Sequence, residues 1–190
     1  MPDTFPVLKT ERLILRMPAP EEAGEGVRYS HANLSHLSES GPKPPADFFT
    51  PLYWRNVFIK AREDFLADSA LRLCAFELEK PETIVATVNF TQIFRKGAQF
   101  AYLGYGVDQH KQGQGYMFES ISAALQYVFD DMNLHRIMAN YMPTNERSGN
   151  LLKRLGFTIE GYARDYLLIN DSWRDHILTS LTNANWRNLS

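Results

Sequence analysis

Three strand-like segments follow one another through the middle of the chain, and they limit the possible folds more than any other feature. Residues 71–78, 83–94 and 100–108 are rich in β-branched and aromatic residues. The connections between them, EKPE and RKGA, are so short that antiparallel strands are predicted. From residue 117 the apolar residues recur at helical spacing, which predicts a helix with one buried face.

The remaining segments complete an α/β (α+β) pattern. Strands are predicted at 12–16, at 135–142 and in a closing hairpin over 157–181 around Asn170 and Asp171, and helices at 20–34, 51–68 and 145–156, the last with Gly156 as C-cap. This order predicts a mixed, mostly antiparallel sheet of about seven strands with helices on both faces. The breaker-rich segment 40–47 separates two helices rather than two domains, because what precedes it is too short to hold a core, so a single domain over residues 1–190 is predicted.

The composition excludes several classes of protein. The chain of 190 residues has 44% hydrophobic residues, 22% charged residues and a formal net charge of -2, which is typical of a globular protein. No basic patch of the kind that binds a phosphate backbone is indicated, so direct nucleic-acid binding is not expected. The N-terminal segment lacks a signal-peptide pattern and no apolar run is long enough to span a membrane, so a cytoplasmic protein is expected.

Cysteine and histidine offer little for a thiolate or metal site. Cys74 is the only cysteine and lies in a strand-like segment, where a buried structural thiol is favoured over a nucleophile. The five histidines lack the spacing of a zinc site, so no metal is expected.

The segment HKQGQGYMFES, residues 110–120, places two glycines where the predicted strand gives way to the helix. Unpaired N–H groups and the positive end of the helix dipole collect there, so a phosphate would bind well. A P-loop is excluded because Tyr116 and Met117 follow Gly115, and a dinucleotide fingerprint is excluded because Phe118 takes the place of its third glycine. A tight turn and a binding site for another pyrophosphate both remain.

Residues 101–125, AYLGYGVDQHKQGQGYMFESISAAL, resemble the acyl-CoA-binding motif of the GNAT superfamily of N-acetyltransferases, although His110 replaces its usual Gln or Arg. Residues 141–176, beginning YMPTNERSGNLLKRLGF, look like the companion motif, and TERLILR near the start also fits. Within the superfamily the chain resembles the bacterial RimJ and RimL enzymes, and RimJ in particular, which acetylate the N-termini of ribosomal proteins.

This resemblance implies a GNAT-like domain with a splayed central pair of parallel strands, here residues 101–108 and 136–142. It implies acetyl-CoA as co-substrate, wedged between these strands with its pyrophosphate on the glycine loop. The residues expected to bind it, largely through backbone groups, are Gly106, Val107, Gln112, Gly113, Gln114, Gly115, Tyr116, Met117 and Asn145. Asn145 is also expected to cap the helix that follows it.

The resemblance implies catalytic roles for fewer residues than it does for cofactor binding. In RimL-type relatives a serine matching Ser148 assists the leaving thiolate, and the alternative here is a surface serine that completes the helix cap. Many relatives carry an acid at the position of Tyr102, and RimL-type enzymes carry a Glu at the position of Leu167, but this sequence has neither. Asp165, Tyr102, Tyr141 or an ordered water therefore remain as candidates for the general base.

The implied function is acetyl-CoA-dependent N-α-acetylation of a ribosomal protein by direct attack in a ternary complex. The implied acceptor is the N-terminal alanine of the fifth small-subunit protein. Two alternatives stay open: acetylation of a small amine such as a polyamine, an amino acid or an amino-sugar drug, and a non-catalytic module that binds acetyl-CoA or assists ribosome assembly.

Overall fold

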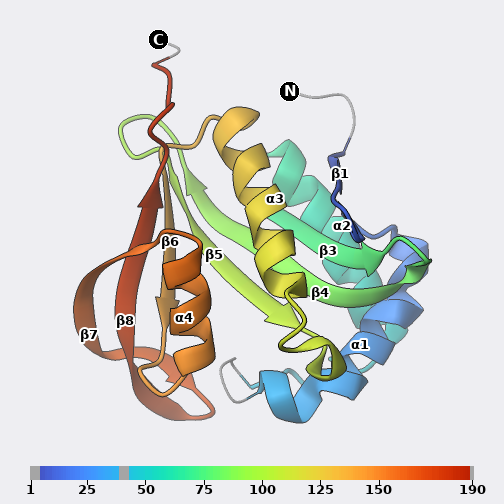
Figure 1. The fold of residues 1–190 in the computed structure, drawn as a ribbon. Coiled ribbons are helices and arrows are strands. Elements are labelled where there is room, and N and C mark those ends of the chain that lie inside the picture. Colours follow the sequence, from blue (N-terminus) through green and yellow to red (C-terminus); the bar gives the residue numbers. More distant parts are fainter. Residues whose placement is uncertain (1–4, 39–42, 189–190) are drawn as a thin grey trace.

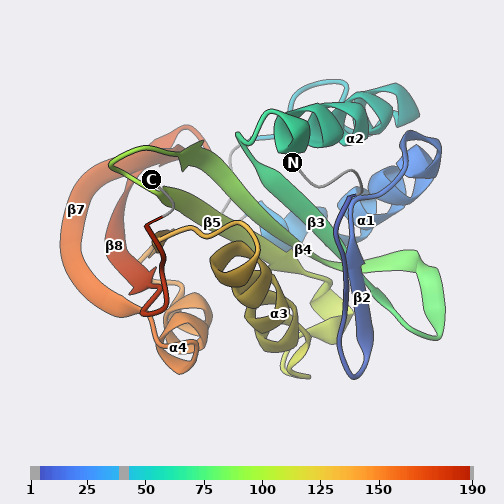
Figure 2. The ribbon, with the colours of Figure 1, turned by 90° about the horizontal axis from the view of Figure 1, so that it is seen from above.

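The computed structural model describes residues 5–38 and 43–188. A twisted eight-stranded sheet forms its centre (Figure 1). Helices α1 and α2 cover one face of the sheet, and α3 and α4 cover the other (Figure 2), so helices on both faces are confirmed. Within the described residues, none of the helices has the length and apolar composition of a membrane span.

The elements follow the predicted order. The strands are β1 (Val7–Lys9), β2 (Leu13–Arg16), β3 (Leu71–Glu77), β4 (Lys80–Phe94), β5 (Phe100–Val107), β6 (Arg136–Tyr141), β7 (Thr158–Ile169) and β8 (Ser172–Thr182). The helices are α1 (Ala23–Leu37), α2 (Pro51–Leu66), α3 (Tyr116–Asp130) and α4 (Glu146–Arg154), with short 3-10 turns at Pro20–Glu22 and Gln109–Lys111.

The strand order across the sheet is β1-β2-β3-β4-β5-β6-β8-β7. Strands β3, β4 and β5 are adjacent and antiparallel, as their short connections predict. Strands β5 and β6 are parallel, since helix α3 carries the chain back between them. Two parallel strands end at the same edge of a sheet, so α3 and α4, which follow them, both begin at that edge (Figure 1).

The core lies mainly between the sheet and α3. Ile121, Ala124 and Val128 are fully buried at helical spacing, which confirms the predicted buried face of this helix. On the other side of the sheet, α1 and α2 approach closely at Gly26, where a Cβ atom would lie 2.6 Å from the Trp54 ring. This contact fixes the helical layer over β3, β4 and β5.

Two details differ from the sequence prediction. The sheet has an eighth strand, β1, whose three residues are too few to show a periodic pattern. The C-cap of α4 is Leu155 rather than the predicted Gly156, which follows it with a φ of 89° and so lies one position beyond the observed cap. Part of the breaker-rich segment, residues 40–42, lies outside the described residues. The hairpin turn at Asn170 and Asp171 is confirmed, with φ values of 48° and 60°.

Candidate active site

Strands β5 and β6 separate soon after they meet. Among the described residues they pair at three positions only, from Phe100 with Arg136 to Tyr102 with Met138. Beyond that point β5 stays paired with β4 through Val107, while β6 stays paired with β8 through Tyr141. Because no β6 residue pairs with β5 from Leu103 onward, an extended ligand with amide groups has a strand edge to pair with.

The glycine loop continues from this strand into α3. Gly115 is the N-cap of α3 with a φ of 83°, and Gly113 has a φ of 71°. Glycine has no side chain with which to cap the first turn, so the N-terminal N–H groups of the helix remain for another acceptor. A Cβ atom at Gly113 would meet nothing within 4 Å. Its surroundings are open, and this geometry fits an anionic phosphate group.

Arg12, in the turn before β2, holds this loop in place. Its Nη1 donates to the Gln114 carbonyl at 3.1 Å, and its Nε donates to Glu119 Oε2 at 2.7 Å. Glu119 also accepts from Thr10 Oγ1 at 2.6 Å. Burial raises the pKa of Glu119, but the hydrogen bonds from Thr10 and Arg12 outweigh it, so the pKa lies below its ordinary value. The carboxylate therefore stays charged and fixes the start of α3.

Several side chains of the loop are held by contacts within the protein. The Tyr116 hydroxyl donates to Glu77 at 2.6 Å, and Met117 is buried in the core. The Gln114 amide donates to the His110 carbonyl at 2.8 Å. Gln112 contacts the His36 ring and accepts a hydrogen bond from Arg147 in α4. The loop is thus braced against both α1 and α4, and its backbone is the part left to hold a ligand.

Gly106, which precedes the loop on β5, faces α1. A Cβ atom there would lie 3.0 Å from Leu37 and 3.7 Å from the Tyr29 hydroxyl. The close packing of α1 therefore explains why residue 106 is a glycine. Val107 points to the other face and packs against the main core.

The N-terminus of α4 places Ser148 beside β5. Asn145 caps the helix and accepts from the Ser148 N–H at 3.1 Å, as predicted. The Ser148 hydroxyl lies 2.6 Å from the Tyr105 hydroxyl, so this hydrogen bond joins α4 to β5 across the separating strands. Burial raises the pKa of Tyr105 to about 12, which keeps the phenol protonated.

Tyr102 lies on the opposite face of β5. Residues three apart in a regular strand point to opposite faces, and β5 pairs without interruption from Tyr102 to Val107. The Tyr102 hydroxyl interacts with that of Tyr166, which also accepts from Asn140 Nδ2 at 3.1 Å. The Tyr166 ring lies 5.5 Å from that of buried His176. These four residues form a cluster of uncharged phenol and amide groups with an imidazole, which we call the tyrosine cluster.

Asp165 directly precedes Tyr166 of the tyrosine cluster in the chain. It is an exposed residue of β7 with a φ of 47°, at an irregularity in the pairing with β8. Its N–H donates to Asp175 Oδ1 at 2.9 Å, and Asp175 also accepts from Tyr162. None of the hydrogen bonds found among the described residues joins Asp165 to Ser148 or Tyr102, and the catalytic roles of these three residues stay predictions.

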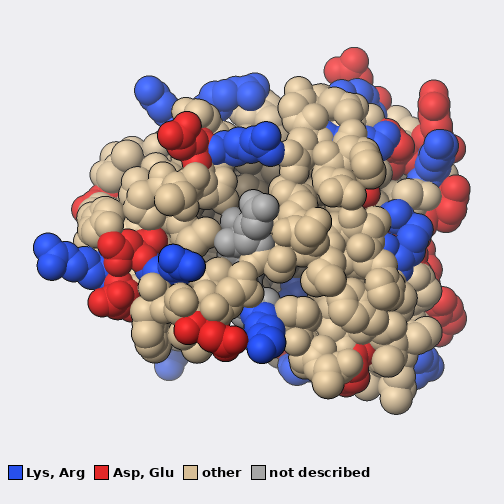
Figure 3. All heavy atoms as spheres, turned by 90° about the horizontal axis from the view of Figure 1, so that it is seen from below, with Lys and Arg blue, Asp and Glu red and all other residues tan. Residues whose placement is uncertain are grey.

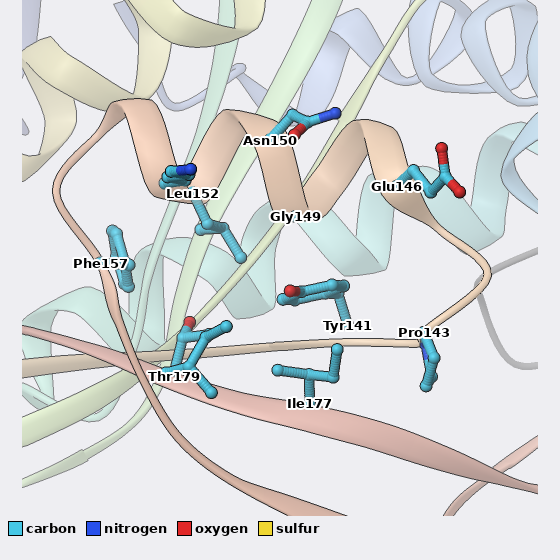
Figure 4. Close-up of a pocket in the computed structure, with 11 residues that line it drawn as sticks. Tyr141, Pro143, Glu146, Gly149, Asn150, Leu152, Phe157, Ile177 and Thr179 are labelled. Atoms are coloured by element: carbon cyan, nitrogen blue, oxygen red, sulfur yellow. The ribbon is translucent and has the colours of Figure 1, made fainter.

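Helix α4 also covers a cavity of about 520 Å³ (Figure 4). The helix contributes Glu146, Gly149, Asn150 and Lys153, which share one helical face, and Ser148 is not among the lining residues. The Tyr141 ring lies beneath Gly149, where a Cβ atom would be 2.7 Å from it. Gly149 therefore lets α4 sit close to β6, which helps to place Ser148 on the other side of the helix.

Charge is mixed on the face where α3 and α4 begin. Lysine and arginine alternate there with aspartate and glutamate around a largely uncharged area (Figure 3). The turn of the β7–β8 hairpin reaches the end of α1 at this side, since Asn170 Nδ2 donates to the Ser38 carbonyl at 2.6 Å.

Cys74 is buried, and burial raises its pKa to about 12, so the predicted structural thiol is confirmed.

A model of the acetyltransferase (GNAT) domain matches residues 12–158, which is most of the chain. The chain belongs to the GNAT acetyltransferase family. It is 40% identical over 179 residues to the ribosomal protein uS5-alanine N-acetyltransferase of Escherichia coli K12, over 94% of this chain and 92% of that enzyme. The family and the acyltransferase class predicted from the two motifs are thereby confirmed.

Solved structures of acetyltransferases share the fold of this chain over nearly its whole length. The ribosomal-protein-S5-alanine acetyltransferase of Vibrio fischeri superposes with a TM-score of 0.91 at 33% identity, covering 96% of this chain and all of that one. RimJ of Mycobacterium smegmatis in complex with CoA-disulfide has a TM-score of 0.84 at 24% identity, covering 95% of this chain and 88% of that one. The fold is therefore shared with a protein that has been seen with coenzyme A.

Sequence reasoning missed several residues that the structure brings to the site. Arg12 and Arg147 reach the glycine loop from distant segments. Tyr105 was visible in the strand FAYLGYGVD, three residues after Tyr102, and strand periodicity alone would have assigned the two tyrosines to opposite faces. No sequence signal indicates that Tyr166 meets Tyr102, since this contact depends on how β7 lies across the sheet.

Proposed function

We propose that this acetyltransferase transfers the acetyl group of acetyl-CoA to the N-terminal α-amino group of a ribosomal protein, with the N-terminal alanine of uS5 as its acceptor. The observation that best supports the proposal is the unpaired edge of β5, which is followed along the chain by the glycine loop and the glycine N-cap of α3. The similarity to the uS5-alanine enzymes supports the choice of acceptor. Acetyl-CoA would supply an activated acetyl thioester.

The residues present fit acetyl-CoA. Backbone N–H groups from Gln112 to Met117 would hold the pyrophosphate, helped by the positive end of the α3 dipole. The backbone at Gly106 and Val107, in the part of β5 that β6 does not pair with, would pair with the amides of the pantetheine arm. Asn145 would contact the same arm from the start of α4 while capping the helix.

Ser148 and the tyrosine cluster would then flank the reacting centre from the two faces of the sheet. We assign Ser148 to the leaving sulfur, because its hydroxyl lies on the α4 face. Tyr102 and Tyr166 would hold the acceptor amine by hydrogen bonds. An α-amino group has a pKa of about 8, so a usable fraction is neutral at pH 7 and modest assistance from a hydroxyl or an ordered water suffices. The exposed position of Asp165 does not support it as the base.

The proposal is tested with purified enzyme, acetyl-CoA and a peptide that carries the uS5 N-terminus. We expect the free α-amine to be acetylated, and neither the same peptide with a blocked N-terminus nor spermidine to react comparably. Turnover of spermidine alone would indicate the small-amine alternative, and no turnover with any amine would indicate a binding module. Intact-mass measurement of ribosomal proteins with and without the enzyme should show loss of one acetyl group from uS5.

A further inference from the structure

Tyr105 lies where it can act on Ser148 without touching the acceptor. It belongs to β5, whereas Ser148 belongs to α4 after β6, and their hydroxyls lie 2.6 Å apart. The Tyr105 ring packs against the main hydrophobic core, which fixes its position. The bond therefore spans the place where the two parallel strands have separated.

The chemistry of the two hydroxyls sets the direction of this hydrogen bond. Either oxygen could donate on distance alone. A phenol is the more acidic hydroxyl and an aliphatic hydroxyl is the better acceptor, so Tyr105 donates to Ser148. The Ser148 N–H is already used by the Asn145 cap, so the Ser148 backbone is fixed as well. With its oxygen occupied by Tyr105, the Ser148 hydroxyl directs its own hydrogen elsewhere.

We propose that Tyr105 is a positioning residue that orients and polarises the Ser148 hydroxyl toward the sulfur of coenzyme A. This inference rests on the proposed function. In the transfer, the acceptor nitrogen bonds to the acetyl carbon, and the carbon–sulfur bond breaks with its electron pair on sulfur. The amine releases one proton to solvent, and the Ser148 hydroxyl keeps its proton while it hydrogen-bonds to the thiolate. The thiolate is protonated by solvent after release.

The first test compares Tyr105→Phe, Ser148→Ala and the double variant. Tyr105→Phe keeps the ring that packs in the core and removes only the hydroxyl. We expect it to lower kcat by about tenfold, the usual net worth of one hydrogen bond, with the KM for acetyl-CoA unchanged. Tyr127→Phe, a half-buried tyrosine of α3, is the matched control and should retain full kcat.

The double variant separates a positioning role from an independent one. If Tyr105 acts through Ser148, the double variant should be no slower than Ser148→Ala alone. The proposal would be overturned if the losses in kcat of the two single variants multiply in the double variant. It would also be overturned if Tyr105→Phe has the kcat of the parent enzyme.

A binding measurement tests the pair without turnover. Calorimetric titration compares coenzyme A with desulfo-coenzyme A, which lacks the thiol, between pH 7 and pH 9.5. A hydrogen bond that favours the thiolate should strengthen the binding of coenzyme A relative to its desulfo analogue as the pH rises through the thiol pKa, about 8.5 by analogy with cysteine. Tyr105→Phe should flatten this rise.

This second readout also distinguishes two kinds of failure. An enzyme that turns over no peptide but shows the pH-dependent preference for coenzyme A would contradict the proposed acceptor and leave the Tyr105 inference supported. Equal binding of the two ligands at every pH in the parent enzyme would overturn the inference even if peptide acetylation is observed.

Discussion

The two faces of β5 place the same residue type, tyrosine, in different surroundings. On the α3 and α4 face, Tyr105 is fixed by the core and joined to Ser148, beside backbone N–H groups and a helix dipole. On the α1 face, Tyr102 joins Tyr166 and Asn140 in a cluster without a carboxylate. The first arrangement suits a negative charge on phosphate or sulfur, and the second suits a neutral amine.

The separation of β5 from β6 therefore affects both faces of the sheet as well as opening a strand edge for a ligand. The strands part after Tyr102 and Met138, and under the proposed function this opening lets groups on opposite faces of the sheet reach the same ligand. A fully paired sheet would keep Ser148 and Tyr102 apart. In the proposed function, the acyl donor and the acceptor would therefore approach from different faces and meet in one complex.

The largest expected effect is on the donor side, from Ser148→Ala. The substitution keeps the N–H that donates to Asn145, and alanine is a good helix former, so the fold should be retained. We expect kcat to fall about 100-fold while the Kd for acetyl-CoA stays within about twofold, as for loss of a group that acts in the transition state. Ser122→Ala in α3 is the control. A normal kcat would remove Ser148 from the chemistry.

Gly115→Val should weaken cofactor binding by about tenfold or more. Valine at a φ of 83° is strained by about 2 kcal/mol, and its Cβ atom would approach the Arg12 guanidinium at 3.4 Å. Calorimetric titration with coenzyme A measures the loss. Gly24→Ala in α1, where nothing lies within 4 Å of the new Cβ atom, should bind coenzyme A normally. Unchanged affinity in Gly115→Val would contradict the assignment of the loop.

Tyr166→Phe tests the acceptor side by removing the hydroxyl between Tyr102 and Asn140. Loss of one hydrogen bond of about 1 kcal/mol predicts a fall of about fivefold in kcat/KM for the peptide, with no change in the Kd for acetyl-CoA. Tyr162→Phe, on the exposed side of β7, serves as the control. A change in acetyl-CoA binding would show that the two faces are not separate in function.

The smallest effect on turnover is expected from Glu119→Gln, which acts on the support of the glycine loop. The pKa of Glu119 lies below its ordinary value of 4.5, so its contribution to stability is present above that pH and is lost as the pH falls through the folded pKa. At pH 7 the free energy of unfolding of the variant should be about 1–2 kcal/mol lower than that of the parent, and this difference should shrink in acid.

Urea denaturation of Glu119→Gln at pH 7 and below pH 4 measures this dependence. The exposed Glu63→Gln of α2 provides a control at both pH values. A stability difference between the parent and Glu119→Gln that grows in acid would contradict the ion pair with Arg12.

Much of this arrangement could be predicted from local patterns. Alternation and short turns identified β3 to β5, helical spacing identified α3, and two glycines before it located the loop that we propose binds phosphate. The cap by Asn145 followed from residue preference alone. Strand β1 was not predicted because three residues are too few to show a period. The exposure of Asp165 could not be predicted, because a sequence does not show which side of an edge strand faces solvent.

The sequence by itself determined the family, the order of the elements and the position of the glycine loop, because each depends on residues close together in the chain. Only the tertiary structure decided the pairing of Tyr105 with Ser148, of Tyr102 with Tyr166, and of Arg12 with Glu119. Each of these contacts joins segments at least 43 residues apart, as the Tyr105 and Ser148 pair illustrates. Their geometry is set by sheet order and by the separation of β5 from β6, which no local pattern encodes.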